Sequence, residues 1–370
     1  MTPPLREVTR LRRRDAPFAG VDFAPLEHLL FEIGDSDSRS NDSVERVVFL
    51  ITKDHPERLR VTLPAIAASS DRLYVIDSST GPETRRLCSD LDAPHVWYHG
   101  ADEQRRVVAE KICLQRALDS RFITWLSEDC WDIWSKRNYA LLYARLCGFS
   151  RVLLIDDDVI PPPGLIGESL DLAGAHKLVG AHVRGMPDVS VVGHLSALVG
   201  LTSQSFVSGH FLAVDVASTA GFYFADLYNE DWLFVLLNSI SWPVARHGAI
   251  FQLYWNPYSG TEARAASEEF GEIVIEGVAR SLLGDAGTAR LDQLAHWNDV
   301  LAQRYRTLDE LAASDLVASM PTCAAIMRSI REAASAVTAE RCLSFWQTYQ
   351  ARLPEWRAQI ELAGAEGAPR

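Results

Sequence analysis

Short, strongly apolar segments alternate with helix-like stretches from about residue 47 to residue 155, and this alternation limits the fold more than any other feature of the sequence. The clearest strand is at 151–155, because a short β-branched run of this kind is typical of a strand buried on both faces. Strands that alternate with helices predict an α/β fold with a mostly parallel sheet. The expected strands are 47–51, 73–76, 96–99 and 151–155, and the expected helices are 56–68, 102–118 and 134–147.

The alternation weakens after residue 160, and the last third of the chain has a different pattern. Further strands are expected at 177–182, 206–214 and 244–253. From about residue 262 onward Ala, Leu, Glu and Arg are abundant, and aromatic and leucine side chains recur at helical spacing. This pattern predicts a C-terminal helical region.

The patterns together divide the chain into three parts. We predict an irregular N-terminal arm over 1–44, an α/β domain over 45–260 and a C-terminal helical region over 261–370. The helical region is expected either to pack on the domain or to form a homodimer with a second copy.

Composition excludes several classes of protein. Of the 370 residues 48% are apolar and 23% charged, which is ordinary for a folded domain. The net charge of −13 argues against a nucleic-acid partner, which would need clustered Lys and Arg. The apolar stretches are short, so we expect neither a signal peptide nor a membrane span. The six cysteines include no CxxC pair, which is compatible with a reducing cytoplasm.

Three consecutive aspartates, Asp156, Asp157 and Asp158, follow the strand predicted at 151–155. Ligands of open α/β sheets gather at the carboxyl ends of the strands, and carboxylates suit Mg²⁺ or Mn²⁺. Side chains alternate along an extended chain, so Asp156 and Asp158 are expected to face one way and Asp157 the other. A metal ion there can bridge two phosphates. The simpler alternative is a solvated acidic turn, but three adjacent like charges favour a nearby cation.

Four segments carry a resemblance to a known family. They are 48–59 (VFLITKDHPERL), 73–80 (LYVIDSST), 136–138 (KRN) and the triplet, which looks like a DxD motif. In this order they resemble the GT-A glycosyltransferases, especially the family-2-like group. The resemblance implies a Rossmann-like GT-A fold with a nucleotide-sugar half over about 45–160 and an acceptor half over about 161–260.

The resemblance also implies roles for residues of the donor half. Thr52 and Asp77 would line the nucleotide pocket, and Arg137 would contact the nucleotide or its phosphates. Asp158 would be the metal ligand and Asp156 a ribose or metal contact. Asp157 joins the donor-binding set as the member least expected to matter. Two alternatives stay open: Asp77 can cap a turn with the serines that follow it, and Arg137 can pair with a surface carboxylate.

A second acidic cluster, Glu230-Asp231, precedes an apolar run and is expected to open a helix. Asn229 is a natural N-cap residue, and acids suit the first turn of a helix. In inverting GT-A enzymes a Glu-Asp pair stands at this relative position. The resemblance therefore implies that Asp231 is the base that deprotonates the acceptor, supported by Glu230.

Other residues are expected on the acceptor or metal side. Gly209 would allow close approach of a sugar, and His210 would touch the donor sugar or the acceptor, although a buried core histidine is equally compatible. Trp232 is a candidate acceptor contact. His247 is a candidate for the metal shell.

These observations lead to one principal hypothesis. We expect a cytoplasmic, Mn²⁺- or Mg²⁺-dependent glycosyltransferase that uses a nucleotide-sugar donor and a small-molecule or glycan acceptor, inverting through Asp231. A retaining enzyme of the same fold is the first alternative. A sugar nucleotidyltransferase is less favoured, because residues 52–58 lack the glycine-rich phosphate loop of those enzymes. A non-catalytic binding or scaffold protein is the alternative of another class.

Overall fold

The computed structural model describes most of the α/β domain and of the C-terminal region. The described residues are 30–32, 45–107, 133–184, 190–200, 207, 209–254, 256, 262–284 and 287–365.

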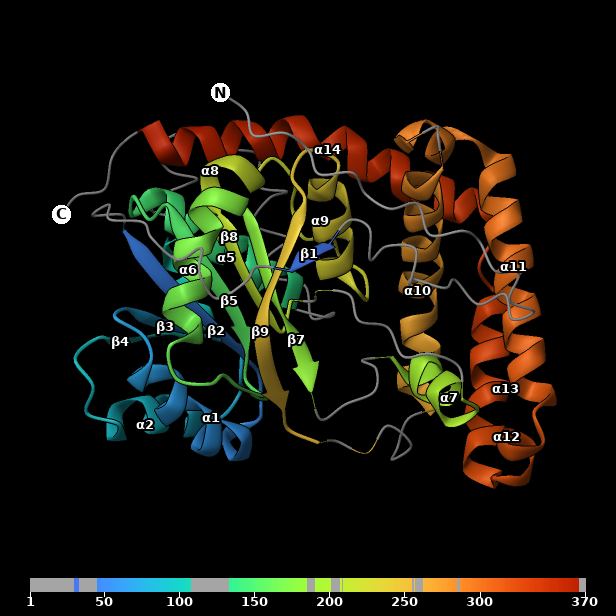
Figure 1. Cartoon of the computed structure of the whole chain (residues 1–370), viewed down its shortest axis with the longest axis horizontal. Coiled ribbons are helices and arrows are strands. Elements are labelled where there is room, and N and C mark those ends of the chain that lie inside the picture. The colour runs from blue at the N-terminus through green and yellow to red at the C-terminus, as the bar shows by residue number, and fades with distance from the viewer. Residues whose placement is uncertain are drawn as a thin grey trace.

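The described strands form one nine-stranded, mostly parallel sheet at the centre of the molecule (Figure 1). The sheet has the order β1-β9-β7-β8-β5-β2-β3-β4, with β6 paired to β9 off this path. Only β8 and β6 pair antiparallel to their neighbours. The strands are β1 (Leu30–Glu32), β2 (Arg46–Thr52), β3 (Leu73–Asp77), β4 (Val96–His99), β5 (Arg151–Asp156), β6 (Val159–Ile160), β7 (Leu178–Arg184), β8 (Phe211–Asp215) and β9 (Val244–Gln252).

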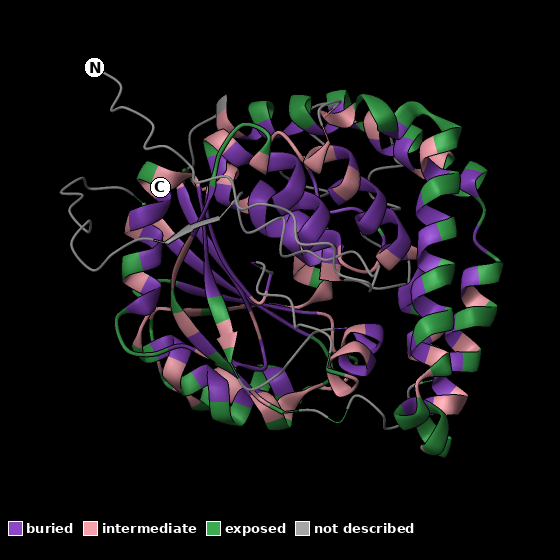
Figure 2. Cartoon of the chain, turned by 45° about the vertical axis from the view of Figure 1, so that its right-hand side comes forward, coloured by how far each residue is buried: buried purple, intermediate pink, exposed green. Residues whose placement is uncertain are grey.

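Two apolar layers cover the sheet, because alternate side chains of each buried strand face opposite sides. Val48 and Leu50 of β2 pack against α1 (Pro56–Ala68) and α6 (Leu165–His176). Val47 and Phe49 face α5 (Ile133–Leu146) and α9 (Glu230–Ser239). The central strands are therefore buried on both faces, as Figure 2 shows. The shorter helices are α2 (Glu83–Asp90), α3 (Ala101–Val107), α7 (Val191–Leu198) and α8 (Val216–Thr219).

The C-terminal region is helical and continues the core of the domain. Helix α14 lies across the domain, where Trp356 donates a hydrogen bond to the Ala220 carbonyl and Tyr349 stacks on Tyr223. Helices α10, α11 and α13 stand side by side at one end of the molecule (Figure 1). The helices of this region are α10 (Glu262–Leu283), α11 (Leu294–Ala313), α12 (Asp315–Ser319), α13 (Pro321–Ser335) and α14 (Ala339–Ala365), with a 3₁₀ turn at Gly287–Asp292.

The predicted fold class is confirmed: a mostly parallel α/β sheet of the expected kind is flanked by helices and followed by a helical region. The expected strand at 206–214 begins later, at Phe211, because Gly209 and His210 form a turn. Of the helix expected at 102–118 the structure describes Ala101–Val107, and the rest lies outside the described residues.

The prediction of a wholly irregular N-terminal arm is wrong at one place. Leu30–Glu32 forms the edge strand β1, which pairs parallel to β9. Three residues are too few to show a strand period in the sequence, and the pairing depends on β9, which lies more than two hundred residues further along. Within the described residues, no helix has both the length and the hydropathy needed to cross a membrane.

Candidate active site

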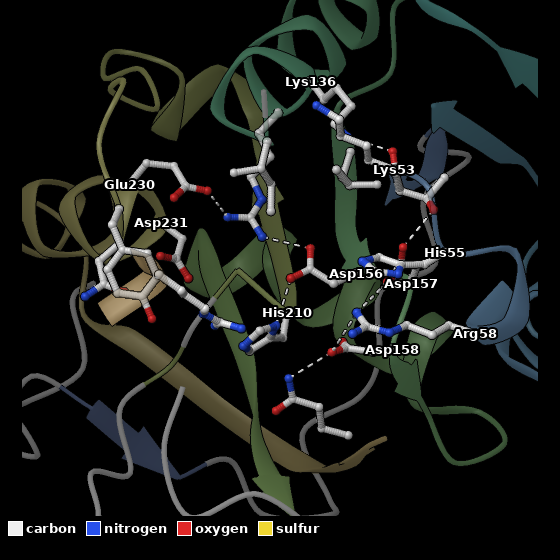
Figure 3. A pocket seen from close by; sticks show the side chains of 18 residues that line it. Lys53, His55, Arg58, Lys136, Asp156, Asp157, Asp158, His210, Glu230 and Asp231 are labelled. Carbon is white, nitrogen blue, oxygen red and sulfur yellow. Dashed lines mark hydrogen bonds and ion pairs between the residues drawn. The ribbon is translucent and has the colours of Figure 1, made fainter. Parts of the chain in front are cut away.

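A cavity of about 500 Å³ lies where β2 and β5 end and α9 begins (Figure 3). Parallel strands present their carboxyl ends at one edge of a sheet, and this edge is the usual ligand site of open α/β folds. Among the described lining residues five are Lys or Arg and five are Asp or Glu. Fold and cavity together define an α/β protein with a mixed-charge site at the strand ends, suited to a polar ligand that carries charge.

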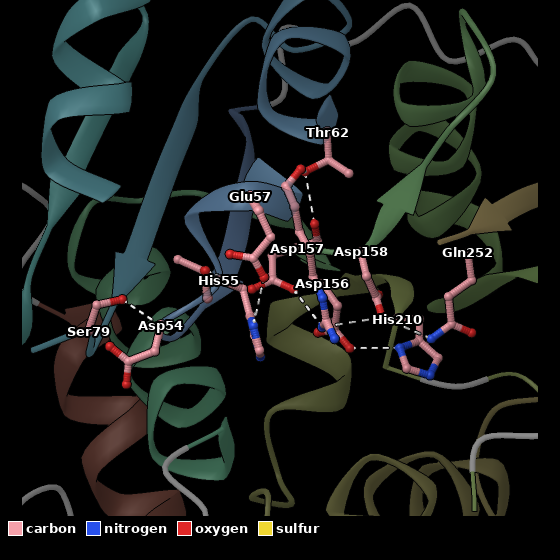
Figure 4. Close-up of polar contacts among 12 residues, drawn as sticks. Asp54, His55, Glu57, Thr62, Ser79, Asp156, Asp157, Asp158, His210 and Gln252 are labelled. Carbon is pink, nitrogen blue, oxygen red and sulfur yellow. Dashed lines mark hydrogen bonds and ion pairs between the residues drawn. The ribbon is translucent and has the colours of Figure 1, made fainter. Parts of the chain in front are cut away.

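Asp156 is held by two cationic side chains, one to each of its carboxylate oxygens. Arg137 Nη2 donates to Oδ1 at 2.8 Å. His210 Nδ1 lies 2.8 Å from Oδ2 (Figure 4). Burial would raise the pKa of Asp156, but Arg137 and His210 lower it to about 2. Burial would likewise lower the pKa of His210, but Asp156 raises it to about 9. The structure thus shows an ionised cluster, and the ribose or metal contact expected for Asp156 stays a prediction.

Asp157 and Asp158 lie in the turn after β5, where the alternation expected of an extended chain no longer applies. Arg58 Nη1 lies 3.5 Å from Asp157 Oδ1 and 3.7 Å from Asp158 Oδ2, so both carboxylates face the same guanidinium. Thr52 Oγ1 donates to Asp157 at 2.7 Å. Burial raises the pKa of Asp157 to about 6, with Asp158 adding to the shift and Thr52 opposing it. The expectation that Asp157 faces away from its neighbour is therefore wrong.

The residues at Asp158 fit one side of a divalent metal site. Among the described residues Asp158 Oδ1 is buried and has no hydrogen-bond partner, while Oδ2 accepts from Gln252 at 3.1 Å. The described residues contain no cluster of three or more side chains that could hold a metal by themselves. Mg²⁺ and its analogues often bind through one or two carboxylates and complete their shell with water and substrate phosphates. A carboxylate oxygen without a hydrogen-bond partner, beside a cavity lined by charged side chains, suits that mode of binding.

Arg137 connects the two halves of the cavity. Its side chain is 2% exposed, and its Nη1 donates to Glu230 at 2.5 Å while Nη2 donates to Asp156. Gly209 makes room for it, because a Cβ at that position would lie 2.5 Å from Arg137 Cζ. The structure gives Gly209 this role beside Arg137, and Gly209 is not among the residues that line the cavity. The two carboxylates that pair with Arg137 line the cavity, and neither is a surface carboxylate.

Glu230 and Asp231 open α9 and line the cavity on the side opposite Arg58 (Figure 3). Asp231 Oδ2 accepts the Gly209 backbone N–H at 2.5 Å, and Oδ1 accepts from Trp232 N at 2.9 Å. Burial raises the pKa of Glu230 to about 8, with Arg137 opposing the shift. Asp231 is therefore fixed by backbone donors, and Glu230 by the guanidinium.

Asn229 occupies the N-cap position of α9, but its side chain does not cap the helix. The residue is left-handed, with φ 63° and ψ 34°, and it makes no side-chain cap hydrogen bond. Its Nδ2 instead donates to Glu272 of α10 at 2.9 Å. The expectation of a capping side chain is corrected, because the left-handed backbone of Asn229 departs from the extended conformation of a usual N-cap residue.

Thr52 lines the cavity as expected, and its carbonyl accepts a hydrogen bond from Lys136 Nζ at 2.6 Å. Lys136 also donates to Ser78 at 2.9 Å, which ties β2 to the segment after β3. The buried Lys136 side chain therefore holds the end of β2 close to the segment after β3 by hydrogen bonds.

Asp77 lies beside Thr52 in the sheet, but its carboxylate does not reach the cavity. It is fully buried, with Oδ1 accepting from the N–H and hydroxyl of Ser79 and Oδ2 accepting from Tyr98 at 2.8 Å. The geometry matches the alternative in which Asp77 closes a turn, and the nucleotide contact expected of its side chain stays a prediction.

Two other predicted site residues lie away from the cavity. His247 Nε2 is 2.9 Å from Glu168, and five residues of strand separate His247 from Gln252, or about 16 Å at ~3.3 Å per residue. The metal role expected of His247 finds no support in this contact and stays a prediction. Trp232 is 5% exposed and packs in the apolar core, and the acceptor contact expected of it also stays a prediction.

Several cavity residues were not identified from the sequence. Arg58, Lys136 and Gln252 each contact a strand end or the triplet directly. Arg58 lies in the first turn of α1 and Lys136 precedes Arg137, so both fall within the segments that carry the resemblance. A search for basic residues there would have found them, but Gln252 has no comparable signal.

Comparison with known proteins yields distant structural matches. No protein-family model and no curated protein matches the sequence. Similar solved structures include glucosyl-3-phosphoglycerate synthase from Mycobacterium tuberculosis with phosphoglyceric acid, at TM-score 0.42 and 16% identity over 63% of this chain and 78% of that chain. Another structure of that synthase matches at TM-score 0.41 and 13% identity over 72% and 84% of the two chains. A third, with Mn²⁺, UDP-glucose and glycerol 3-phosphate, matches at 0.41 and 16% over 63% and 79%. Similarity at this level assigns no ligand, so any assignment depends on the site itself.

Proposed function

We propose that this chain is a metal-dependent glycosyltransferase that moves a sugar from a nucleotide diphosphate sugar to a small-molecule or glycan acceptor. One observation carries the proposal: a single cavity brings together the acidic triplet after β5 and the Glu230–Asp231 pair at the start of α9. The triplet supplies an open carboxylate at Asp158, and the pair supplies a fixed carboxylate at Asp231.

The donor diphosphate would lie on the side of Asp158 and Arg58. A bound Mn²⁺ or Mg²⁺ supplies positive charge that stabilises the departing nucleoside diphosphate. Arg58 and Lys136 line this side and add fixed positive charge where negative charge develops on the leaving phosphate.

The acceptor hydroxyl would approach from the side of Asp231. Each Asp231 oxygen accepts one backbone N–H and keeps a second lone pair, so the carboxylate can take the hydroxyl proton as the new glycosidic bond forms. The bond between the anomeric carbon and the phosphate oxygen breaks at the same time. Base and leaving group on opposite sides of one cavity favour inversion at the anomeric carbon.

The test is a transfer assay with a panel of UDP-, GDP-, dTDP- and ADP-sugars, with and without Mn²⁺. Nucleoside diphosphate release measures turnover, and NMR of the product gives the anomer. Asp231→Asn should retain metal-dependent donor binding and lose turnover by about 10²-fold or more, the scale of general-base catalysis. The matched control Asp309→Asn changes an exposed carboxylate of α11 outside the cavity and should behave as wild type.

Other outcomes would change the assignment. Near-full turnover by Asp231→Asn would remove the base assignment, and a product with the donor's anomeric configuration would identify a retaining reaction. Release of pyrophosphate would identify a nucleotidyltransferase. If no nucleotide-sugar binds with or without metal, the chain is not a glycosyltransferase.

A further inference from the structure

Helix α10 of the C-terminal region contacts the segment that leads into the candidate base. Gly271 lies against the backbone of Tyr228, so that an added Cβ would be 2.2 Å from the Tyr228 carbonyl oxygen. Glu272, the next residue of α10, accepts the hydrogen bond from Asn229 Nδ2. Two consecutive residues of α10 thus hold the two residues that precede Glu230.

The Asn229 backbone shows why this support matters. A non-glycine residue with φ 63° is uncommon, although asparagine tolerates this conformation better than most residues. A strained residue persists where its surroundings fix it. The Asn229 side chain makes no cap hydrogen bond within α9, and its amide donates to Glu272, so α10 is one of the elements that hold the segment in this conformation.

Helix α10 is itself fixed against α11 by buried charge. Arg304 of α11 is 2% exposed and donates to Glu269 at 2.8 and 2.7 Å and to Glu276 at 2.6 Å. It also lies 3.6 Å from Glu272. The three glutamates recur at helical spacing on one face of α10, so one guanidinium sets how the two helices align. The position of Glu272 is therefore determined by the C-terminal helices.

Arg264, near the start of the same helix, reaches the cavity with its side chain. It is one of the cavity-lining residues, and its guanidinium interacts with Glu268 and with the Tyr228 side chain. Glu268 in turn accepts a hydrogen bond from the Val191 backbone at the start of α7. Helix α10 thus both lines the cavity and holds the Tyr228–Asn229 segment.

We propose that Gly271 and Glu272 of α10 are positioning residues that fix the start of α9, and with it Asp231, at the acceptor side of the cavity. The inference rests on the proposed function for its catalytic consequence. Its structural part, that α10 holds residues 228–231, can be measured without any substrate.

The experiment compares two methyl insertions and two changes at Glu272. Gly271→Ala forces a backbone atom to move, whereas Gly167→Ala on α6 places its methyl in open space and is the matched control. Glu272→Ala removes the acceptor for Asn229, and Glu272→Gln keeps one. The readouts are hydrogen exchange of residues 228–233, donor affinity and turnover.

In Gly271→Ala and Glu272→Ala the amide hydrogens of residues 228–233 should exchange about tenfold faster, equivalent to ~1.4 kcal/mol of local stability. Exchange at residues 151–156 should not change. Both should lose about tenfold in kcat with donor affinity within about twofold. Glu272→Gln and Gly167→Ala should match wild type in all three readouts. Unchanged exchange at 228–233 in both disruptive variants would overturn the inference, as would equal losses in donor affinity and kcat. If wild type transfers no sugar, the proposed function fails, and the exchange measurement still decides whether α10 holds the segment.

Discussion

Replacing Arg137 by methionine should destabilise the protein strongly, because its guanidinium neutralises two buried carboxylates. Side-chain exposure is 2% for Arg137, 6% for Glu230 and 13% for Asp156, so water screens neither ion pair appreciably. Removing one partner of a buried ion pair costs about 3–5 kcal/mol. Asp156 keeps His210 as a partner, whereas the described contacts leave Glu230 no other cation. Most of the loss should therefore come from Glu230.

Urea denaturation at pH 9, above the pKa of about 8 of Glu230, measures this loss while that carboxylate is ionised, and a second substitution identifies its source. Adding Glu230→Gln to Arg137→Met removes the uncompensated charge and should restore about 1–3 kcal/mol of the free energy of unfolding. Arg137→Lys keeps the charge but has one nitrogen in place of the two that donate to Glu230 and Asp156. Its free energy of unfolding should therefore lie between those of wild type and Arg137→Met. The reasoning is refuted if Arg137→Met loses less than about 1 kcal/mol, or if the double variant is no more stable than the single one.

Three further changes have defined outcomes. Arg58→Met should tighten Mn²⁺ binding in the absence of nucleotide by about tenfold, or ~1.4 kcal/mol, because Arg58 competes with the metal ion for Asp158. Calorimetry measures this affinity, and weaker binding by the variant would show that Arg58 does not compete. Gly209→Ala should lower the free energy of unfolding by about 1–3 kcal/mol, because the added Cβ overlaps the Arg137 guanidinium. Urea denaturation measures this loss, and a midpoint equal to that of wild type would contradict this geometry. Burial lowers the pKa of His99, so the native state binds its proton less readily than the unfolded chain and stability should fall as the pH drops below about 6.5. His99→Gln should flatten the unfolding free energy over that range, and an unchanged slope would show that His99 does not contribute to it.

The sequence predicted the fold well because the signals for it are local. A buried parallel strand such as Arg151–Asp156 is visible as a short apolar run, and the helices between strands are visible by their period. The edge strand Leu30–Glu32 had no such signal, because its existence depends on a partner strand and not on its own residues.

The site was predicted only in part, because a side chain's role depends on partners that are distant in sequence. The cavity does contain Thr52, Arg137, the triplet, His210, Glu230 and Asp231. The resemblance assigned Asp77 to the nucleotide, but Tyr98, on the neighbouring strand, and Ser79 satisfy its carboxylate. The resemblance also made His247 a candidate for the metal shell, whereas its Nε2 lies 2.9 Å from Glu168 of α6.

The same dependence explains the unexpected contacts. The segment that carries the resemblance marks Arg58 as a basic residue near the site, but it does not indicate that Arg58 faces two aspartates about a hundred residues away. Nothing near Asn229 indicates that a glutamate of the C-terminal region takes its side-chain amide. Both contacts are created by the packing of helices on the strand ends, which the local pattern does not specify.

The most direct test of the central claim is whether a nucleotide-sugar binds with the help of a metal ion at Asp158. Thermal unfolding of wild type and Asp158→Asn would be measured with a donor sugar, with and without Mn²⁺. At a ligand concentration of about 100 times Kd, binding to the folded state adds ~2.7 kcal/mol of stability. The account predicts a Mn²⁺-dependent rise in Tm for one nucleotide class in wild type and none in Asp158→Asn. An equal rise in both proteins, or a rise that does not depend on Mn²⁺, would contradict it.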